Sequence, residues 1–338
     1  MNQVYVGGSY FHIYIAILKS LDRKDKSTKS LLILNDHTPG VDKIIPLLEK
    51  SGYFDHIIHV PFVTLKRRIK EEQGTLSHIV SRNRFAIEYV DQNSPILQYD
   101  SFIRNAEINL FYNLGLSSFY FLIKYKHNFI RMLEDGEHNY HPKVGKFKAW
   151  RRRFLLRTAI GEGFDPEVKE IEVQHVHRLS PRVRHKGKTL ELSRMRESLS
   201  PEEQQKILSL FLNGQTVPVT DGKNLLLITQ PLSEDKLMTE GEKIKMYDRI
   251  LNQYGEGHNI FIKGHPRELT MYSGKLNHAF TEIPRPFPLE MMDFMNGVSF
   301  DRGITIFSSS LYNLQCIRER IFLGREFIKE FKQQITQI

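Results

Sequence analysis

Lysine, glycine, histidine and proline follow one another at positions 263–266, directly after the apolar run 260–262. The apolar run predicts a buried strand, and the proline predicts that strand pairing ends there. Open α/β sheets bind ligands at the carboxyl ends of strands, where Gly264 leaves room for close approach to the backbone. Lys263 would offer a positive charge there and His265 a donor or an acid. The stretch therefore predicts a phosphate site, although a strand followed by a charged turn is the simpler reading of four residues alone.

A second candidate is the acidic stretch Glu134-Asp135-Gly136-Glu137. A glycine among carboxylates predicts a loop at a strand end. Clustered carboxylates repel one another, which raises the pKa of one of them and suits it to general-base catalysis; a plain acidic turn is the alternative. We predict no metal site, because the chain contains no Asp-x-Asp and the spacing of Glu134, Glu137, His138 and His141 is not diagnostic of a metal.

Further polar residues follow the expected strands of the second half. Thr229 and Gln230 end the apolar run 225–228, and Glu290 starts an expected helix. The serines Ser308, Ser309 and Ser310 come after an expected strand and begin a helix that we predict to continue through Arg320. Serines and free backbone amides at a helix start can bind an anion, although N-capping alone would also explain them.

Basic residues gather in two stretches of the first half. The first comprises Lys66, Arg67, Arg68, Lys70, Arg82 and Arg84. The second runs from Lys143 to Arg157 without an acid, includes Lys143, Lys146, Lys148, Arg151, Arg152 and Arg153, and interleaves Phe147, Trp150 and Phe154. Such residues suit a nucleic acid or an anionic polysaccharide, whereas most runs of charge are simply solvated helix faces.

Strands and helices are expected to alternate in both halves of the chain. In the first half, strands are predicted at 4–6, 31–34 and 56–60, with helices at 10–21 and 41–51. In the second half, strands are predicted at 225–230, 259–262, 279–283 and 303–307, with helices at 201–212 and 240–254. This alternation is typical of βαβ units and a parallel sheet, so the predicted fold class is α/β. The Gly7-Gly8 turn lacks the third glycine of a dinucleotide fingerprint and is interpreted as structural.

Size and composition are those of a globular protein with room for two domains. The chain has 338 residues, 40% of them hydrophobic and 26% charged. Its net charge of +9 points to a polyanionic partner, substrate or surface. Because Cys316 is the only cysteine, a reducing cytoplasm is the expected compartment. No apolar run is long enough to span a bilayer, and no secretory leader is expected before the strand at 4–6.

Three short motifs then resemble those of a known family. Glu134-Asp135-Gly136, Lys263-Gly264-His265-Pro266 and Ser308-Ser309 are similar to the acid-acid-Gly, His-Pro and paired-serine motifs of bacterial sialyltransferases, and most of all of the bacterial capsular polysialyltransferases. The resemblance implies a GT-B fold, in which two Rossmann-like lobes face a central cleft and a C-terminal helix crosses back. We accordingly expect an acceptor-binding lobe at 1–190, a donor-binding lobe at 191–317, and a helix at 318–338 that packs on the first lobe.

The same resemblance implies a role for each motif residue. Glu134 would be the general base, in place of the aspartate found in several relatives, and His265 would meet the CMP phosphate and help it depart. Lys263, Gly264 and Pro266 would line the cytosine, Glu290 would hold the ribose, and Ser308 and Ser309 the phosphate. Thr229, Gln230 and Ser310 complete the predicted donor site. The family inverts configuration without a metal and uses no cofactor besides the donor substrate, CMP-sialic acid.

The basic residues favour a polymerising enzyme, because extension of an anionic chain requires a positive track. We expect Lys66, Arg67, Arg68, Lys70, Arg82, Arg84, Lys143, Lys146, Arg151, Arg152 and Arg153 to bind oligo- or polysialic acid, with position 8 of the terminal sugar as the favoured acceptor. The alternative is that this charge holds the enzyme at anionic inner-membrane lipid, near a capsule export complex. A mono-sialyltransferase, a glycerophosphotransferase and a non-catalytic protein that binds polyanions or nucleic acid also remain open; we expect no nucleic-acid partner.

Overall fold

The computed structural model describes residues 1–22, 27–73, 79–111, 115–136, 139–140, 144–155, 158–217, 221–295, 297–308 and 310–336. Lys143, Ser309, Glu137, His138 and His141 lie outside the described residues, as does the side chain of Arg82. The chain divides into two compact units, Met1–Ser200 and Pro201–Ile338, whereas the sequence placed the boundary after residue 190.

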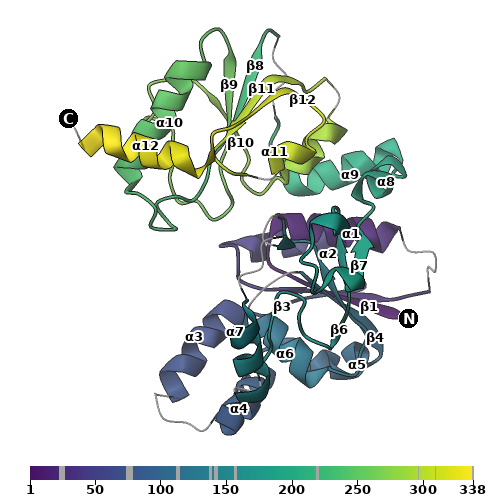
Figure 1. Ribbon diagram of the computed structural model, residues 1–338. Coiled ribbons are helices and arrows are strands. Elements are labelled where there is room, and N and C mark those ends of the chain that lie inside the picture. Colours follow the sequence, from purple (N-terminus) through teal and green to yellow (C-terminus); the bar gives the residue numbers. More distant parts are fainter. Residues whose placement is uncertain are drawn as a thin grey trace. The chain divides into compact units, whose positions relative to one another are not determined.

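The first unit is built on a parallel sheet, in which seven strands are described in the order β3-β2-β1-β4-β5-β6-β7 (Figure 1). The strands are β1 Asn2–Gly7, β2 Ser30–Leu34, β3 His56–His59, β4 Ala106–Phe111, β5 Ile130–Leu133, β6 Val168–Val173 and β7 Gly187–Thr189. All pairs of neighbouring strands are parallel. The order reverses between β1 and β4, which makes the carboxyl ends of these two strands the topological switch point, where ligands bind in such sheets.

Helices connect these strands. They are α1 Tyr10–Leu21, α2 Ile45–Ser51, α3 Phe62–Gln73, α4 Ile79–Gln92, α5 Asp100–Arg104, α6 Leu116–Lys124, α7 Lys146–Trp150 and α8 Leu192–Glu197. Short 3-10 helices cover Val41–Ile44, Pro95–Tyr99, Val176–Arg178 and Arg184–Lys186, and a π-helical turn, Arg151–Leu155, continues α7. All five residues of β2 are buried, as expected for a strand of a parallel sheet that is covered on both faces.

The second unit repeats this design with a parallel sheet, in which five strands are described in the order β10-β9-β8-β11-β12. The strands are β8 Asn224–Ile228, β9 Asn259–Lys263, β10 Thr281–Ile283, β11 Phe300–Thr305 and β12 Ile317–Phe322. The helices are α9 Pro201–Leu212, α10 Glu240–Tyr254, the 3-10 helix η7 Leu289–Phe294, α11 Ser310–Asn313 and α12 Gly324–Thr336. Its switch point lies between the carboxyl ends of β8 and β11.

The end of the chain differs from the prediction. The expected helix from Ser308 through Arg320 is wrong, because α11 is a single turn and β12 follows it, paired with β11. Consequently residues 318–322 are strand, not helix. The amphipathic helix α12 places Ile328 and Phe331 in the hydrophobic core of the second unit. None of the described helices is long and apolar enough to cross a membrane.

Candidate active site

In the first unit, His12 and Asp135 meet at the carboxyl edge of the sheet. Nε2 of His12 lies 2.5 Å from Oδ1 of Asp135. The backbone N–H of Gly8 donates a hydrogen bond to Nδ1 of His12 over 3.1 Å. The imidazole therefore carries its proton on Nε2, which donates a hydrogen bond to Asp135. The ring of His12 stacks on that of Phe111 with centroids 4.2 Å apart. His12 therefore joins the ends of β1, β4 and β5. The sequence signals it only as a polar residue within the apolar first turns of α1.

Glu134 directly follows β5, as predicted, but it is buried, with 4% of its surface exposed. Its carboxylate accepts hydrogen bonds from the backbone N of Gln174 at 2.7 Å and from Nε2 of the same residue at 3.3 Å. Burial, followed by the negative charge of Glu134, raises the pKa of Tyr140. Glu134 is thus held at the sheet edge by donors that favour its charged form, next in sequence to the more exposed Asp135.

The Gly7-Gly8 turn is explained by packing within the chain. A Cβ on Gly8 would lie 1.7 Å from Oδ1 of Asn35, and one on Gly7 would lie 2.7 Å from Cβ of His12. The turn also accepts backbone hydrogen bonds from Asn35 and Thr38, at 2.8 and 3.0 Å. The glycines therefore bring His12 close to the sheet edge, in agreement with the structural interpretation.

In the second unit, His265 follows β9 in the predicted loop. Its Nδ1 accepts the backbone N–H of Arg267 at 3.1 Å, which leaves the proton on Nε2, as in His12. Burial lowers the pKa of His265 to about 4, helped by the nearby charges of Arg267 and Lys263. The imidazole is therefore neutral at pH 7 and offers an Nε2–H donor. To act as the acid that the sequence predicted, His265 needs a bound anion that raises its pKa.

Lys263 ends β9 and is almost fully buried. Its Nζ donates to the carbonyl oxygens of Gly264 and Arg285, both at 3.0 Å. Burial lowers the pKa of Lys263 to about 7, while the charge of Glu290 opposes the shift. Glu290 lies on η7 and is itself buried. A Cβ on Gly264 would lie 3.2 Å from Nε of Arg285, so the glycine permits this tight junction.

A buried network around Glu268 holds the predicted donor loop. Oε2 of Glu268 accepts from the Thr229 hydroxyl at 2.5 Å and from the backbone N of His265 at 3.2 Å. Its Oε1 accepts from Nζ of Lys243 at 3.1 Å and from the Tyr272 hydroxyl at 2.5 Å. Glu268 and Lys243 are both inaccessible to solvent at the side chain. Sequence reasoning missed this pair, although Glu268 stands three residues after His265.

The other predicted donor residues differ in accessibility. Thr229 is fully buried and its hydroxyl is committed to Glu268, so the structure uses it inside the network. The backbone N of Gln230 donates to the Tyr247 hydroxyl at 2.8 Å. Ser308 is partly exposed and its backbone N donates to Oγ1 of Thr305 at 3.2 Å. Ser310 begins a helix of only one turn, which removes the helix-terminus argument for an anion site, and Pro266 is partly exposed beside His265.

Three of the predicted acceptor residues line one cavity of the first unit. Lys66 and Lys70 come from α3 and Arg152 from the turn after α7, and they border a cavity of about 360 Å³ together with apolar side chains of α4 and α6. Figure 1 shows α7 beside α3 and α4. The remaining described acceptor residues, Arg67, Arg68, Arg84, Lys146, Arg151 and Arg153, do not line it. Arg84 forms an exposed pair with Glu88 on its own helix, at 2.7 Å.

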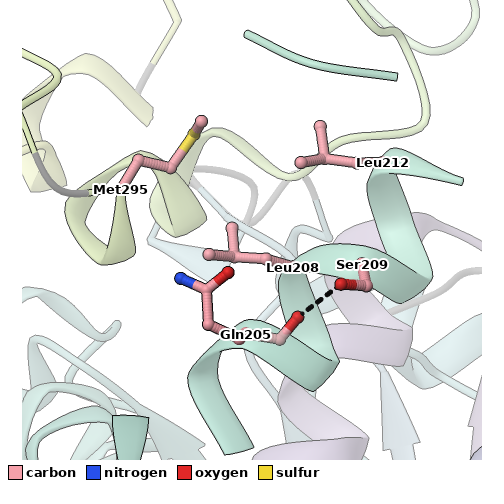
Figure 2. Close-up of a pocket in the computed structure, with 5 residues that line it drawn as sticks. All are labelled: Gln205, Leu208, Ser209, Leu212 and Met295. Carbon is pink, nitrogen blue, oxygen red and sulfur yellow. Dashed lines mark hydrogen bonds between the residues drawn. The ribbon is translucent and has the colours of Figure 1, made fainter. Parts of the chain in front are cut away.

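A second cavity, of about 270 Å³, lies in the second unit between α9 and η7. Figure 2 shows its lining, where the Ser209 hydroxyl donates to the backbone oxygen of Gln205 at 2.8 Å. None of the predicted donor residues borders it. Within the described ranges, no group of three or more His, Cys, Asp or Glu side chains is placed to hold a metal ion.

Solved structures with the same architecture include two UDP-GlcNAc 2-epimerases. The enzyme from Neisseria meningitidis bound to UDP-GlcNAc has a TM-score of 0.50 at 11% identity, covering 99% of this chain and 92% of that chain. The enzyme from Methanocaldococcus jannaschii in complex with UDP-GlcNAc and UDP has a TM-score of 0.50 at 11% identity, covering 100% and 93%. At this identity the likeness shows the fold alone, and it confirms the predicted GT-B class with Rossmann-like units.

Two sequence comparisons bear on the family. An uncharacterized protein of Haemophilus influenzae is 30% identical over 183 residues, which are 54% of this chain and 58% of that protein. The match therefore spans less than two thirds of that relative's length. A family model of glycosyltransferase family 52 matches residues 77–321, most of the chain and both units. The chain belongs to glycosyltransferase family 52.

Proposed function

We propose that the protein is an inverting, metal-independent sialyltransferase that uses CMP-sialic acid and extends oligo- or polysialic acid, with position 8 of the terminal sugar as the favoured acceptor. Glycosyltransferase family 52 is a sialyltransferase family, which supports the class of donor. The choice of a polymeric acceptor rests on the basic residues of the first unit and on the net charge of +9.

One observation carries the proposal. Each unit places its chemistry-bearing motif at the carboxyl edge of its own parallel sheet, Glu134-Asp135 after β5 and Lys263–His265 at the end of β9. The family match includes both motifs. Sheet edges of this kind bind ligands, so the two clusters are the natural places for acceptor and donor chemistry.

On the donor side, the bond between the anomeric carbon and a phosphate oxygen breaks, and CMP leaves with the electron pair. The growing phosphate charge needs a donor that is already oriented. His265 provides one, because Arg267 fixes its tautomer with the proton on Nε2. An arriving phosphate raises the pKa of the imidazole from about 4, so that it stabilises the leaving group more strongly as charge develops.

On the acceptor side, the hydroxyl oxygen of the acceptor forms the new bond to the anomeric carbon while its proton passes to a carboxylate. We assign this general base to Glu134, whose carboxylate is held in place by Gln174. The carboxylate of Asp135, next in sequence, accepts a hydrogen bond from the Nε2–H of His12. A Glu134 carboxylate held by Gln174 is positioned to accept the proton of the acceptor hydroxyl.

The cavity bordered by Lys66, Lys70 and Arg152 supports an anionic acceptor, because three cations converge there from two separate stretches of sequence. Arg67, Arg68, Arg84, Lys146, Arg151 and Arg153 would extend the positive surface. The single Cys316 supports a reducing, cytoplasmic setting, where an enzyme of capsule synthesis would meet its donor and a capsule export complex. A mono-sialyltransferase would use the same donor chemistry on a different acceptor.

The proposal is tested by incubating the full chain with CMP-sialic acid and a fluorescent oligosialic acid primer, with a chelator present, and resolving products by length. A ladder of longer products that is lost in His265→Ala supports the polymerase. A single added sugar restricts the function to mono-sialyl transfer. Intact CMP-sialic acid, together with salt-sensitive binding to unrelated polyanions, would overturn the enzyme and favour a polyanion-binding protein. Transfer from CDP-glycerol in place of CMP-sialic acid would identify a glycerophosphotransferase.

A further inference from the structure

A turn at the carboxyl end of β6, residues 174–178, lies beside the proposed base. Its first residue, Gln174, binds both oxygens of the Glu134 carboxylate through its backbone N–H and its side-chain amide. The next backbone N–H, that of His175, donates to the hydroxyl oxygen of Tyr140 at 3.2 Å. Burial, then the charge of Glu134 and a hydrogen bond with it, raise the pKa of Tyr140. The 174–178 turn, Tyr140 and Glu134 therefore form one connected cluster.

Arg178 ends this turn and contacts the same cluster. Its guanidinium carbon lies 4.5 Å from the centroid of the Tyr140 ring, and the residue is exposed to solvent. An arginine can place the face of its planar guanidinium on an aromatic ring and direct the N–H edge of the same group to a carboxylate, in two parallel hydrogen bonds. A solvent-exposed cation is thus separated from the proposed base, Glu134, by a single ring.

Three other cations of this stretch bind the backbone of the chain itself. Residues 173–190 contain no aspartate or glutamate. Arg184 donates twice to the backbone oxygen directly after the turn, at 3.2 and 2.9 Å. Nζ of Lys186 donates to two backbone oxygens, at 3.0 and 2.8 Å, and Arg182 donates to one at 3.3 Å. These contacts give the three cations a structural role, whereas Arg178 lies at the sheet edge that carries Glu134.

The backbone of the turn is held in place by packing. Leu179, directly after the turn, is buried, and Val176 packs against the hydrophobic core of the first unit. A Cβ on Gly187 would lie 2.5 Å from Cγ1 of Val176, so this glycine lets β7 approach the turn closely. The backbone N–H of Arg178 donates to the backbone oxygen of His175 at 2.9 Å. Because the backbone that carries the guanidinium is already ordered, less entropy is lost when the guanidinium binds a ligand.

We propose that Arg178 binds the carboxylate of the acceptor's terminal sugar and thereby selects acceptors that end in an acidic sugar. This inference rests on the proposed function and names the group of the acceptor that the site recognises. The reacting hydroxyl must approach Glu134, so a cation next to Glu134 meets the charged group of the same sugar unit. A neutral terminal sugar would shield the guanidinium from water without offering it a partner, and polar groups left unpaired in this way reject such analogues.

The test compares two acceptors that differ only in the charge of the terminal sugar. A fluorescent disialyl primer carries at its non-reducing end either the free carboxylate or the corresponding primary amide. We expect the full chain to bind the free acid about 10- to 100-fold more tightly than the amide, measured by fluorescence anisotropy without donor. The same preference should appear in kcat/KM for transfer. Arg178→Gln should abolish both preferences and leave KM for CMP-sialic acid unchanged.

Two variants serve as controls. Arg104→Gln is the matched one, because the guanidinium of Arg104 also lies over a ring, that of Tyr125 at 5.7 Å, but on α5, which precedes β4 at the opposite edge of the sheet. Tyr140→Phe keeps the ring under Arg178 and removes only the hydroxyl. Both variants should keep the preference for the free acid.

The outcomes separate this inference from the proposed function. Equal binding of the two primers by the wild type, or an unchanged preference in Arg178→Gln, would overturn the role of Arg178 while sialyl transfer itself stands. A wild type that transfers to neither primer and leaves CMP-sialic acid intact would overturn the proposed function, and this inference with it.

Discussion

Nε2 of His12 lies 2.5 Å from Oδ1 of Asp135, although 123 positions separate the two residues in the chain. The contact joins the helix after β1 to the loop after β5 across the switch point of the first sheet. It places this hydrogen-bonded pair next in sequence to the proposed base, Glu134. We regard His12 as a positioning residue, because it contacts the loop of Glu134 and not, in our proposal, the substrate.

A double-mutant cycle tests this relationship. We expect His12→Phe, which keeps a ring against Phe111 but loses the hydrogen bonds to Gly8 and Asp135, to lower kcat without changing KM for CMP-sialic acid. Asp135→Asn should have a similar effect. The two changes should not add, with a coupling energy of about 0.5–3 kcal/mol, as is typical of residues in contact. Strict additivity, or a loss that appears only in KM for the donor, would contradict a positioning role.

Replacement of the proposed base has a larger expected effect. Glu134→Gln keeps the length of the side chain and one oxygen for Gln174 but removes the proton acceptor, so kcat should fall about 100- to 10,000-fold. Glu170→Gln, a partly exposed carboxylate of β6 paired with Arg131 at 2.9 Å, is the matched control and should retain activity. Single-turnover transfer rates measure both. A near-normal transfer rate in Glu134→Gln would show that another residue is the general base.

The buried pair of Glu268 and Lys243 predicts a large change in stability. Glu268→Gln leaves Lys243 with Glu234 alone, at 3.1 Å, and turns an acceptor into a donor beside Thr229. Removal of one partner of a buried pair costs about 3–5 kcal/mol in the free energy of unfolding. Urea unfolding compares this variant with Glu240→Gln, which breaks an exposed pair with Lys275 and should cost at most about 1 kcal/mol. Equal losses of unfolding free energy in the two variants would show that the buried network contributes no more to stability than an exposed ion pair.

The low pKa of Lys263 makes stability depend on pH. Burial holds this pKa at about 7, against an ordinary value of 10.5. Between these values the unfolded chain binds a proton that the folded chain has released, so the contribution of Lys263 to the free energy of unfolding rises with pH. It is least favourable below pH 7 and fully gained near pH 10.5.

Urea unfolding of the wild type and of Lys263→Met over this pH range checks the effect. The free energy of unfolding of the wild type, minus that of the variant, should increase by about 1.4 kcal/mol for each unit of pH between these two pKa values. A difference that is constant with pH, or that falls as pH rises, would show that Lys263 keeps its proton in the folded chain.

The sequence predicted the parallel architecture because alternating apolar runs and helices leave few other solutions. It also placed Glu134 and His265 at strand ends, since each follows an apolar run closely. The prediction of one helix from Ser308 through Arg320 was wrong, because this stretch forms α11 and most of β12. The sequence of β12, with three charged residues between Ile317 and Ile321, lacks the regular apolar–polar alternation of a strand. It is a strand because it pairs with β11, and this long-range pairing overrides local preference.

The partners of the site residues were less accessible to sequence reasoning. His12 contacts Asp135 only after β1 and β5 have come into one sheet, and Lys243 contacts Glu268 only after α10 has packed on it. Such pairs depend on register and burial, which composition does not report. The predicted acceptor residues were named for their charge alone, and only the folded chain shows which of them share a cavity: Lys66, Lys70 and Arg152.

Each sheet closes around its own apolar interior, with Val4 and Ile108 in one and Leu225 and Ile304 in the other. Among the described strands, none of one unit pairs with a strand of the other. Each unit could therefore be replaced without breaking a sheet. A chimera joined near Ser200 would preserve both sheets intact. Under our proposal, recombination at that junction would let a lineage exchange the donor-binding unit while the acceptor-binding unit stays as it is.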